Sequence, residues 1–179
     1  MREKFAKSQI ALHWLTVLLI AIAYTTIELR GLVPRGSWAR NLMIMTHYSC
    51  GVSVWVLMLA RGVLRHRHAS PDILPPPPRW QQGLANLMHL LLYALFLVLP
   101  ILGVTSKYLN GRPWQLFGVV MPVSATPNFD LADSLISWHE TLAPLGYWLI
   151  GLHAAAALLH HYVFKDNTLL RIMPARKRG

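Results

Sequence analysis

The chain has 179 residues, of which 54% are hydrophobic and only 13% are charged, yet its formal net charge is +10. Soluble domains carry about 25% charged residues, so this chain has too few to cover a hydrated surface, and its apolar content excludes a disordered chain. The length excludes a large multidomain enzyme, and the single cysteine excludes a disulfide framework, a cysteine-ligated zinc site and an iron–sulfur cluster.

Four apolar stretches are each long enough to cross a bilayer as a helix, which takes about 20 residues. In chain order they run approximately over residues 9–29, 41–64, 83–108 and 133–164. They are apolar on all faces and fill more than half of the chain. We therefore predict an all-α, integral membrane four-helix bundle that forms a single domain over residues 1–179, and a soluble helical bundle is the less favoured alternative.

Two of the connections have a distinctive composition. The run of prolines at residues 75–78 cannot be helical and predicts a stiff polyproline link without chemistry of its own. The segment 110–131 is longer and carries Trp, Phe and Met. We expect it to lie at the membrane surface and to cover one end of the bundle.

The basic residues sort unequally between the two sides of the predicted bundle. With an even number of spans both termini share one side, and twelve Lys and Arg residues lie there: Arg2, Lys4, Lys7, Arg61, Arg65, Arg67, Arg79, Lys165, Arg171, Arg176, Lys177 and Arg178. The other side has five: Arg30, Arg35, Arg40, Lys107 and Arg112. The positive-inside rule then places both termini in the cytoplasm. The basic tail at residues 175–179 is expected to contact anionic lipid head groups, and nucleic-acid binding is not expected.

Histidines inside the predicted spans need an explanation, because ionisable residues within a membrane are costly. His139 and His153 are 14 residues apart in the fourth stretch. On one helix this spacing puts them within about 40° of the same face and about 21 Å apart along the axis. Gly146 lies midway on the same stripe and leaves space at the helix surface. Such a helix would serve two stacked cofactors, one near each membrane face.

Each of these histidines has a partner at matching depth. His47 and His139 both lie about six residues inside spans that enter from the outer side, whereas His13 and His153 lie toward the cytoplasmic side. Two imidazoles across a bundle core are suitable axial ligands for a b-type haem. The sequence thus predicts two haem b groups, held by His47 with His139 and by His13 with His153.

Other interpretations of these histidines remain open. No C-x-x-C-H motif is present, so any haem would be bound non-covalently. Zinc is the second choice of cofactor, but it takes four ligands, or three plus water. The histidines would otherwise only form hydrogen bonds between helices. Gly51, one turn after His47, either gives the outer ring clearance or serves ordinary small-residue helix packing.

Longer segments around these histidines resemble the bacterial cytochrome b561 family. They are QIALHWL around His13, THYSCG around His47, IELRGLVPR after the first span, and SWHETLAPLGYWLIGLHAAAALLHHYVFKDNTLLRIMP around His139 and His153. The resemblance extends along essentially the whole chain. The family's four haem ligands fall on the same four histidines, and the resemblance implies a multi-pass protein of the bacterial inner membrane.

The resemblance also implies a function. The chain closely resembles the superoxide-oxidising members, which implies a di-haem b oxidoreductase that passes electrons from periplasmic superoxide to ubiquinone. The alternative is a cytochrome b subunit that links a separate dehydrogenase or hydrogenase to the quinone pool. A protein partner is therefore possible in principle but not required by the first function.

Sites for the two substrates are hypotheses at this stage. The five outer basic residues, Arg30, Arg35, Arg40, Lys107 and Arg112, either steer the superoxide anion or act as interfacial anchors and haem propionate partners. Nearby acids offset part of their charge. Quinone would bind on the cytoplasmic side near His160, His89 and Ser8. The alternative is that His160 lies at the membrane interface and that His89 forms a hydrogen bond to a neighbouring helix.

Overall fold

The computed structural model describes residues 4–174. Its elements are α1 (Lys7–Leu29), the 3-10 turn η1 (Arg30–Leu32), α2 (Trp38–Arg67), α3 (Arg79–Leu109), β1 (Gln115–Leu116), β2 (Val119–Val120), α4 (Phe129–Leu142), α5 (Leu145–Tyr162) and α6 (Thr168–Ile172). Arg2 and the basic tail at residues 175–179, which we expect to touch lipid, lie outside the described residues.

The predicted all-α membrane bundle is confirmed. Four helical segments are long and apolar enough to cross a membrane: α1 with η1, α2, α3, and α4 continued by α5. Only 6% to 22% of the residues in their apolar stretches are buried inside the protein. Most of the apolar side chains therefore face outward, where lipid rather than water is the compatible solvent.

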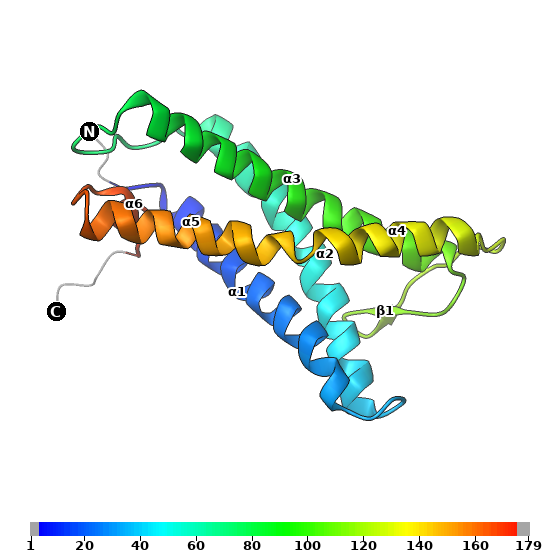
Figure 1. Cartoon of the computed structure of the whole chain (residues 1–179). Coiled ribbons are helices and arrows are strands. Elements are labelled where there is room, and N and C mark those ends of the chain that lie inside the picture. Colours follow the sequence, from blue (N-terminus) through cyan, green and yellow to red (C-terminus); the bar gives the residue numbers. More distant parts are fainter. Residues whose placement is uncertain (1–3, 175–179) are drawn as a thin grey trace.

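The helices form two pairs that meet in a small core. Helix α1 packs mainly against α2, and α3 against α4. Val54 and Met58 of α2 and Phe96 of α3 form the buried centre between them. The start of α1 and the helix α6 lie at one end of the bundle, called here the terminal end (Figure 1). At the other end, the hairpin end, η1 and the β1–β2 hairpin lie, and the two helix pairs diverge (Figure 1).

Polar residues extend the helices beyond the apolar stretches. Ser37 caps α2 by accepting a hydrogen bond from the Arg40 N–H at 3.3 Å, and Asn128 caps α4 by accepting one from the Leu131 N–H at 3.0 Å. These side chains satisfy backbone donors that a helix start leaves free. Helices α2 and α4 accordingly begin three and four residues before the apolar stretches predicted from the sequence.

The fourth span is two helices, although the sequence predicts one. Pro144 has no N–H to donate and interrupts the helical hydrogen-bond ladder between α4 and α5. The N–H groups of Gly146 and Tyr147 reach back only three residues, to the carbonyls of Ala143 at 2.9 Å and Pro144 at 3.2 Å. His139 and His153 therefore lie on separate helices rather than on one continuous stripe.

Tyr24 of α1 occupies the space beside this break. Its hydroxyl donates a hydrogen bond to the Ala143 carbonyl at 2.7 Å. A Cβ on Gly146 would collide with the same hydroxyl. The clearance predicted at Gly146 is thus filled by a neighbouring helix and is not left for a cofactor.

We expect Gly146→Ala to destabilise the protein by about 1–3 kcal/mol, because the added methyl group overpacks a tight helix contact. The matched control is Gly151→Ala on the same helix, where an added Cβ meets nothing within 4 Å. That change should be neutral or slightly stabilising, since alanine favours helices over glycine. Thermal unfolding in detergent, followed by circular dichroism, compares the two. Equal transition midpoints would contradict the packing role of Gly146.

The segment between α3 and α4 covers the side of α2 at the hairpin end. Strands β1 and β2 pair antiparallel, with Gln115 opposite Val120 and Leu116 opposite Val119. The N–H of Phe117 in the turn donates to the Ser49 hydroxyl of α2 at 2.9 Å. The segment thus packs against α2 at this end of the bundle, and its position at the membrane surface stays a prediction.

The proline-rich connector is fastened to the terminal end of the bundle. The Arg171 guanidinium of α6 donates a hydrogen bond to the Pro71 carbonyl, and the Leu74 N–H donates to the Asn167 side chain at 2.9 Å. The Phe5 N–H donates to the Arg171 carbonyl at 3.1 Å. The connector therefore joins the first and last segments of the chain in one polar cluster.

Candidate cofactor sites

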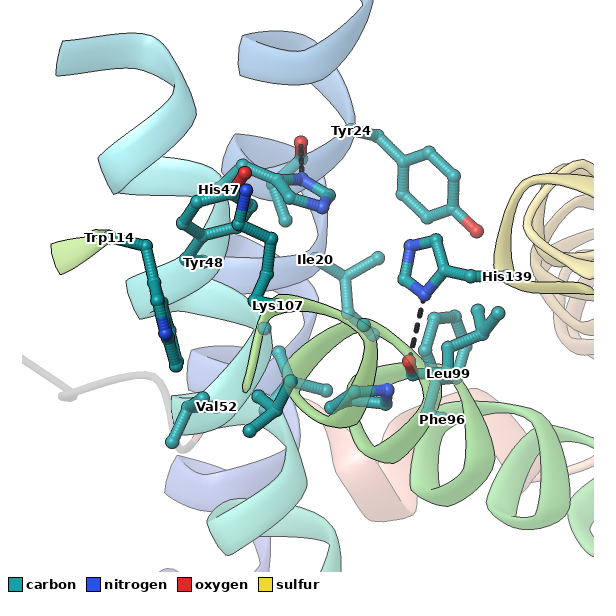
Figure 2. A pocket seen from close by; sticks show the side chains of 16 residues that line it. Ile20, Tyr24, His47, Tyr48, Val52, Phe96, Leu99, Lys107, Trp114 and His139 are labelled. Carbon is teal, nitrogen blue, oxygen red and sulfur yellow. Dashed lines mark hydrogen bonds between the residues drawn. The ribbon is translucent and has the colours of Figure 1, made fainter. Parts of the chain in front are cut away.

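His47 of α2 and His139 of α4 face each other across the bundle at the hairpin end (Figure 2). Their ring centroids are 6.2 Å apart. The Nδ1 of His47 lies 2.9 Å from the Ala23 carbonyl, and the Nδ1 of His139 lies 2.8 Å from the Leu99 carbonyl. A carbonyl can only accept, so each Nδ1 carries the proton and each Nε2 keeps its lone pair. This is the state in which an imidazole ligates a metal.

Small residues bring these rings close to the neighbouring backbones. Gly103 lies one turn after Leu99 on α3, and a Cβ there would lie only 3.3 Å from the His139 Nδ1. The missing side chain lets the imidazole reach the Leu99 carbonyl. Ala23, which carries only a methyl group, lies buried on α1 beside His47.

The His47–His139 pair opens into a mainly apolar pocket. It holds about 590 Å³ of empty space, its open mouth included, and takes its walls from α1, α2, α3 and Trp114 (Figure 2). Gly51 lines it, and a Cβ there would meet nothing within 4 Å. Gly51 is therefore not needed for helix packing, and its role in giving the outer haem ring clearance stays a prediction.

His13 of α1 and His153 of α5 form the second pair, at the terminal end. Their ring centroids are 6.4 Å apart. His89 of α3 joins them, with its ring centroid 5.5 Å from that of His153. The Nδ1 of His13 accepts a hydrogen bond from the Arg61 guanidinium at 3.1 Å. Arginine has no acceptor atom, so this contact assigns the His13 proton to Nε2.

Both pairs have the spacing that a six-coordinate haem iron requires. Metal–imidazole bonds are about 2 Å long and each nitrogen is about 1 Å from its ring centroid, so the centroids of two axial rings should be about 6 Å apart. The hairpin-end pair fits in both spacing and proton position. The terminal-end pair fits in spacing, and His13 can ligate through Nε2 once the Arg61 guanidinium turns to another acceptor, such as a haem carboxylate.

Zinc does not fit these residues. Among residues 4–174, no group of three or more His, Cys, Asp and Glu side chains is placed to hold a metal ion. Zinc would need such a set, whereas haem needs only two axial ligands because its porphyrin supplies the other four. The geometry favours haem over the second choice of cofactor.

The residues predicted to bind quinone do not form one cluster. His89 lies with the His13–His153 pair, whereas His160 bonds to Asp166 at 2.5 Å. Ser8 is exposed near the start of α1. No contact among the described residues joins His160 to His89 or to Ser8.

Of the five basic residues predicted to steer superoxide, Lys107 lines the pocket. Its Nζ lies 5.5 Å from the centroid of the Tyr48 ring, next to His47 in the chain. The Arg40 guanidinium is engaged by the carbonyls of Arg30 at 2.7 Å and Val33 at 3.2 Å. The Arg30 side chain is half-buried, and the Arg35 and Arg112 side chains are exposed.

Sequence reasoning overlooked two side chains that contact the candidate sites. In the sequence analysis Arg61 serves only as one of the basic residues that set the membrane topology. Its position inside an apolar stretch is itself a signal of function, because a charge within a membrane is costly. Asp166 follows the last span as a single acidic residue, and no motif marks it. Its importance is visible only from the fold of the chain after α5.

Comparison with known proteins agrees with this geometry. A family model described as prokaryotic cytochrome b561 matches residues 4–175. The chain is 49% identical to "Cytochrome b561 homolog 1" of Escherichia coli, over 98% of this chain and 99% of that protein. It is 49% identical to the "Probable superoxide oxidase CybB" of Yersinia pestis over the full length of both. It is 28% identical to "Cytochrome b562" of Cereibacter sphaeroides over 96% of each chain. With four segments long enough to span a membrane and two half-buried histidine pairs, this chain belongs to the prokaryotic cytochrome b561 family of membrane electron-transfer proteins.

Proposed function

We propose that the protein is a di-haem b oxidoreductase of the bacterial inner membrane that passes electrons from periplasmic superoxide to ubiquinone. The observation that carries this proposal is the presence of two histidine pairs, at opposite ends of one bundle, with ring centroids 6.2 and 6.4 Å apart. The relative named as a probable superoxide oxidase, 49% identical over its full length, supports the choice of donor. The charge distribution supports a cytoplasmic terminal end.

The proposed ligand set fits electron transfer and not oxygen activation. His47 with His139, and His13 with His153, would each hold one haem, which when bound would supply a one-electron carrier. With two protein ligands each, the haems would carry electrons and would not bind oxygen.

The overall reaction balances with two donors for each quinone. Two superoxide anions lose one electron each and leave as two molecules of oxygen. Ubiquinone takes up the two electrons and two protons and leaves as ubiquinol. We place the donor at the hairpin end and the acceptor at the terminal end, where His160, His89 and Ser8 are the candidate quinone contacts.

Stopped-flow mixing tests this function. Purified protein with both haems oxidised is mixed with superoxide, and the haem absorbance is followed with and without ubiquinone-1. We expect rapid haem reduction, followed by reoxidation only where the quinone is present. If superoxide leaves the haems oxidised, the donor assignment is wrong, and a cytochrome b subunit serving a separate dehydrogenase or hydrogenase becomes the better proposal.

Lys107→Gln should slow haem reduction by superoxide about two- to fivefold at low ionic strength, because it removes the cation that lines the pocket. The rate of the variant should also depend less on salt. Arg79→Gln is the matched control, since Arg79 is exposed at the terminal end. An equal effect of the two substitutions would reflect net charge alone and would remove the local role of Lys107.

A further inference from the structure

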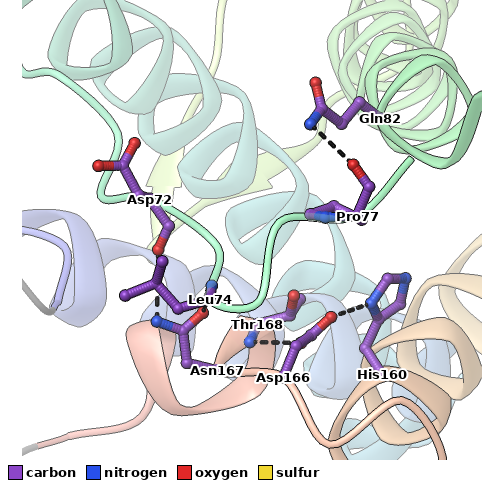
Figure 3. A network of polar contacts seen from close by, with 8 residues as sticks. All are labelled: Asp72, Leu74, Pro77, Gln82, His160, Asp166, Asn167 and Thr168. Carbon is purple, nitrogen blue, oxygen red and sulfur yellow. Dashed lines mark hydrogen bonds and ion pairs between the residues drawn. The ribbon is translucent and has the colours of Figure 1, made fainter. Parts of the chain in front are cut away.

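We propose that Asp166 and His160 form a proton-delivering pair at the terminal end, in which Asp166 positions the imidazole that protonates the reduced quinone. This inference rests on the proposed function and assigns a role to a carboxylate that the electron path does not use. Figure 3 shows the two side chains facing each other where the chain turns back from α5 toward α6.

The carboxylate is held in place by the turn itself. Its Oδ2 lies 2.5 Å from the His160 Nδ1, and its Oδ1 accepts a hydrogen bond from the Thr168 N–H at 2.8 Å. The Asp166 N–H donates to the His160 carbonyl at 3.1 Å. The Asp166 side chain is only 3% exposed, whereas that of His160 is 17% exposed. A buried carboxylate with two fixed bonds thus orients a ring that keeps an open edge.

Asp166 remains ionised in this position. Burial raises the pKa of its carboxyl, but the hydrogen bonds from His160 and from the Thr168 backbone outweigh burial, and the pKa lies below its usual range. Arg171 and Asp72 are the other charged groups of this cluster. An ionised carboxylate can only accept, so the His160 Nδ1 must carry a proton.

This assignment leaves the His160 Nε2 free to exchange protons. His160 follows His153 by seven residues on α5, which is two turns and about 10 Å along the axis. The Nε2 proton of the charged ring would pass to a quinone oxygen, and Nε2 would then take a proton from cytoplasmic water. Each ubiquinone requires this transfer twice, matching its two electrons. Asp166 stabilises the charged ring between transfers and does not itself touch the quinone.

The test isolates the quinone half of the reaction. The protein is reduced with dithionite, mixed with ubiquinone-1 in a stopped-flow instrument, and followed by haem reoxidation, so superoxide is not needed. We expect Asp166→Asn to slow reoxidation by about tenfold or more and to increase the slowing seen in deuterated water. Asp166→Glu, which keeps the carboxylate, should recover part of the rate.

Two further variants keep the result decisive. Asp72→Asn removes the same charge from the same cluster, but the Asp72 contact to Asn167 uses its backbone carbonyl, so wild-type kinetics are expected. His160→Gln can still bond to Asp166 but has no transferable proton, and it should be as slow as Asp166→Asn. Haem content and reduced spectra establish that each variant is folded.

The results for the variants and for the unmodified protein test separate claims. Wild-type reoxidation by Asp166→Asn or His160→Gln with full haem content would overturn the proton-delivering pair and leave the proposed function intact. Equal slowing by Asp72→Asn would also overturn it, because the effect would follow net charge. Failure of quinone to reoxidise the unmodified protein would instead remove the acceptor from the proposed function.

Discussion

His139→Ala should lose one haem and keep the other. His139 contributes one ring of the hairpin-end pair, and His13 and His153 belong to a separate pair. The variant should therefore contain half as much haem per polypeptide as the unmodified protein. A pyridine haemochrome assay against protein concentration gives this ratio, and His47→Ala should give the same one.

The matched control is His161→Ala, one residue from His160 and in neither histidine pair. It should retain the full haem content. Reduced spectra of His139→Ala and His153→Ala should differ and should together resemble the spectrum of the unmodified protein. If His139→Ala and His13→Ala lost the same spectral component, the pairing inferred from the structure would be wrong.

Arg61→Gln should lower the midpoint potential of one haem and leave the other unchanged. The guanidinium lies 3.1 Å from the His13 Nδ1, and a positive charge near a haem favours its reduced form. At about 8 Å and an effective dielectric constant of about 20, a unit charge contributes about 2 kcal/mol, which is roughly 90 mV for one electron. The effect is expected on the haem held by His13 and His153.

Potentiometric titration of the two haem bands measures this change. Arg65→Gln is the matched control, because Arg65 lies one turn further along α2 and is exposed. It should shift the potential little. If neither midpoint potential changed, Arg61 would not tune either haem. If only the haem held by His139 shifted, the assignment of Arg61 to the haem held by His13 and His153 would be wrong. In the unmodified protein, the charge makes electron transfer from the hairpin end toward the terminal end more favourable.

The sequence predicted the spans because bilayer thickness demands long apolar runs, and such runs are visible without tertiary information. It also predicted which histidines meet. His47 and His139, for example, lie at equal depth, and depth follows directly from position in a span. The fold class and the pairing thus follow from the length of the apolar stretches and from the position of each histidine within its stretch. The role of the pairs as haem ligands stays a prediction.

The remaining features depend on contacts that no single segment reveals. The break at Pro144 coincides with the Tyr24 hydroxyl, which comes from the first helix and fills the space beside Gly146. The bond from Arg61 to His13 joins two helices and fixes a proton position. Asp166 becomes significant only because the chain folds back after α5. Such side-chain geometry requires the folded molecule.

The hydrogen bonds of the hairpin-end pair involve all four membrane-spanning segments. His47 reaches from α2 to the α1 carbonyl of Ala23, and His139 reaches from α4 to the α3 carbonyl of Leu99. An iron bound by both rings would therefore join the α1–α2 pair to the α3–α4 pair at the end where they diverge (Figure 1). Loss of this haem would therefore loosen the hairpin end of the bundle first, while the core of Val54, Met58 and Phe96 would still join the two helix pairs.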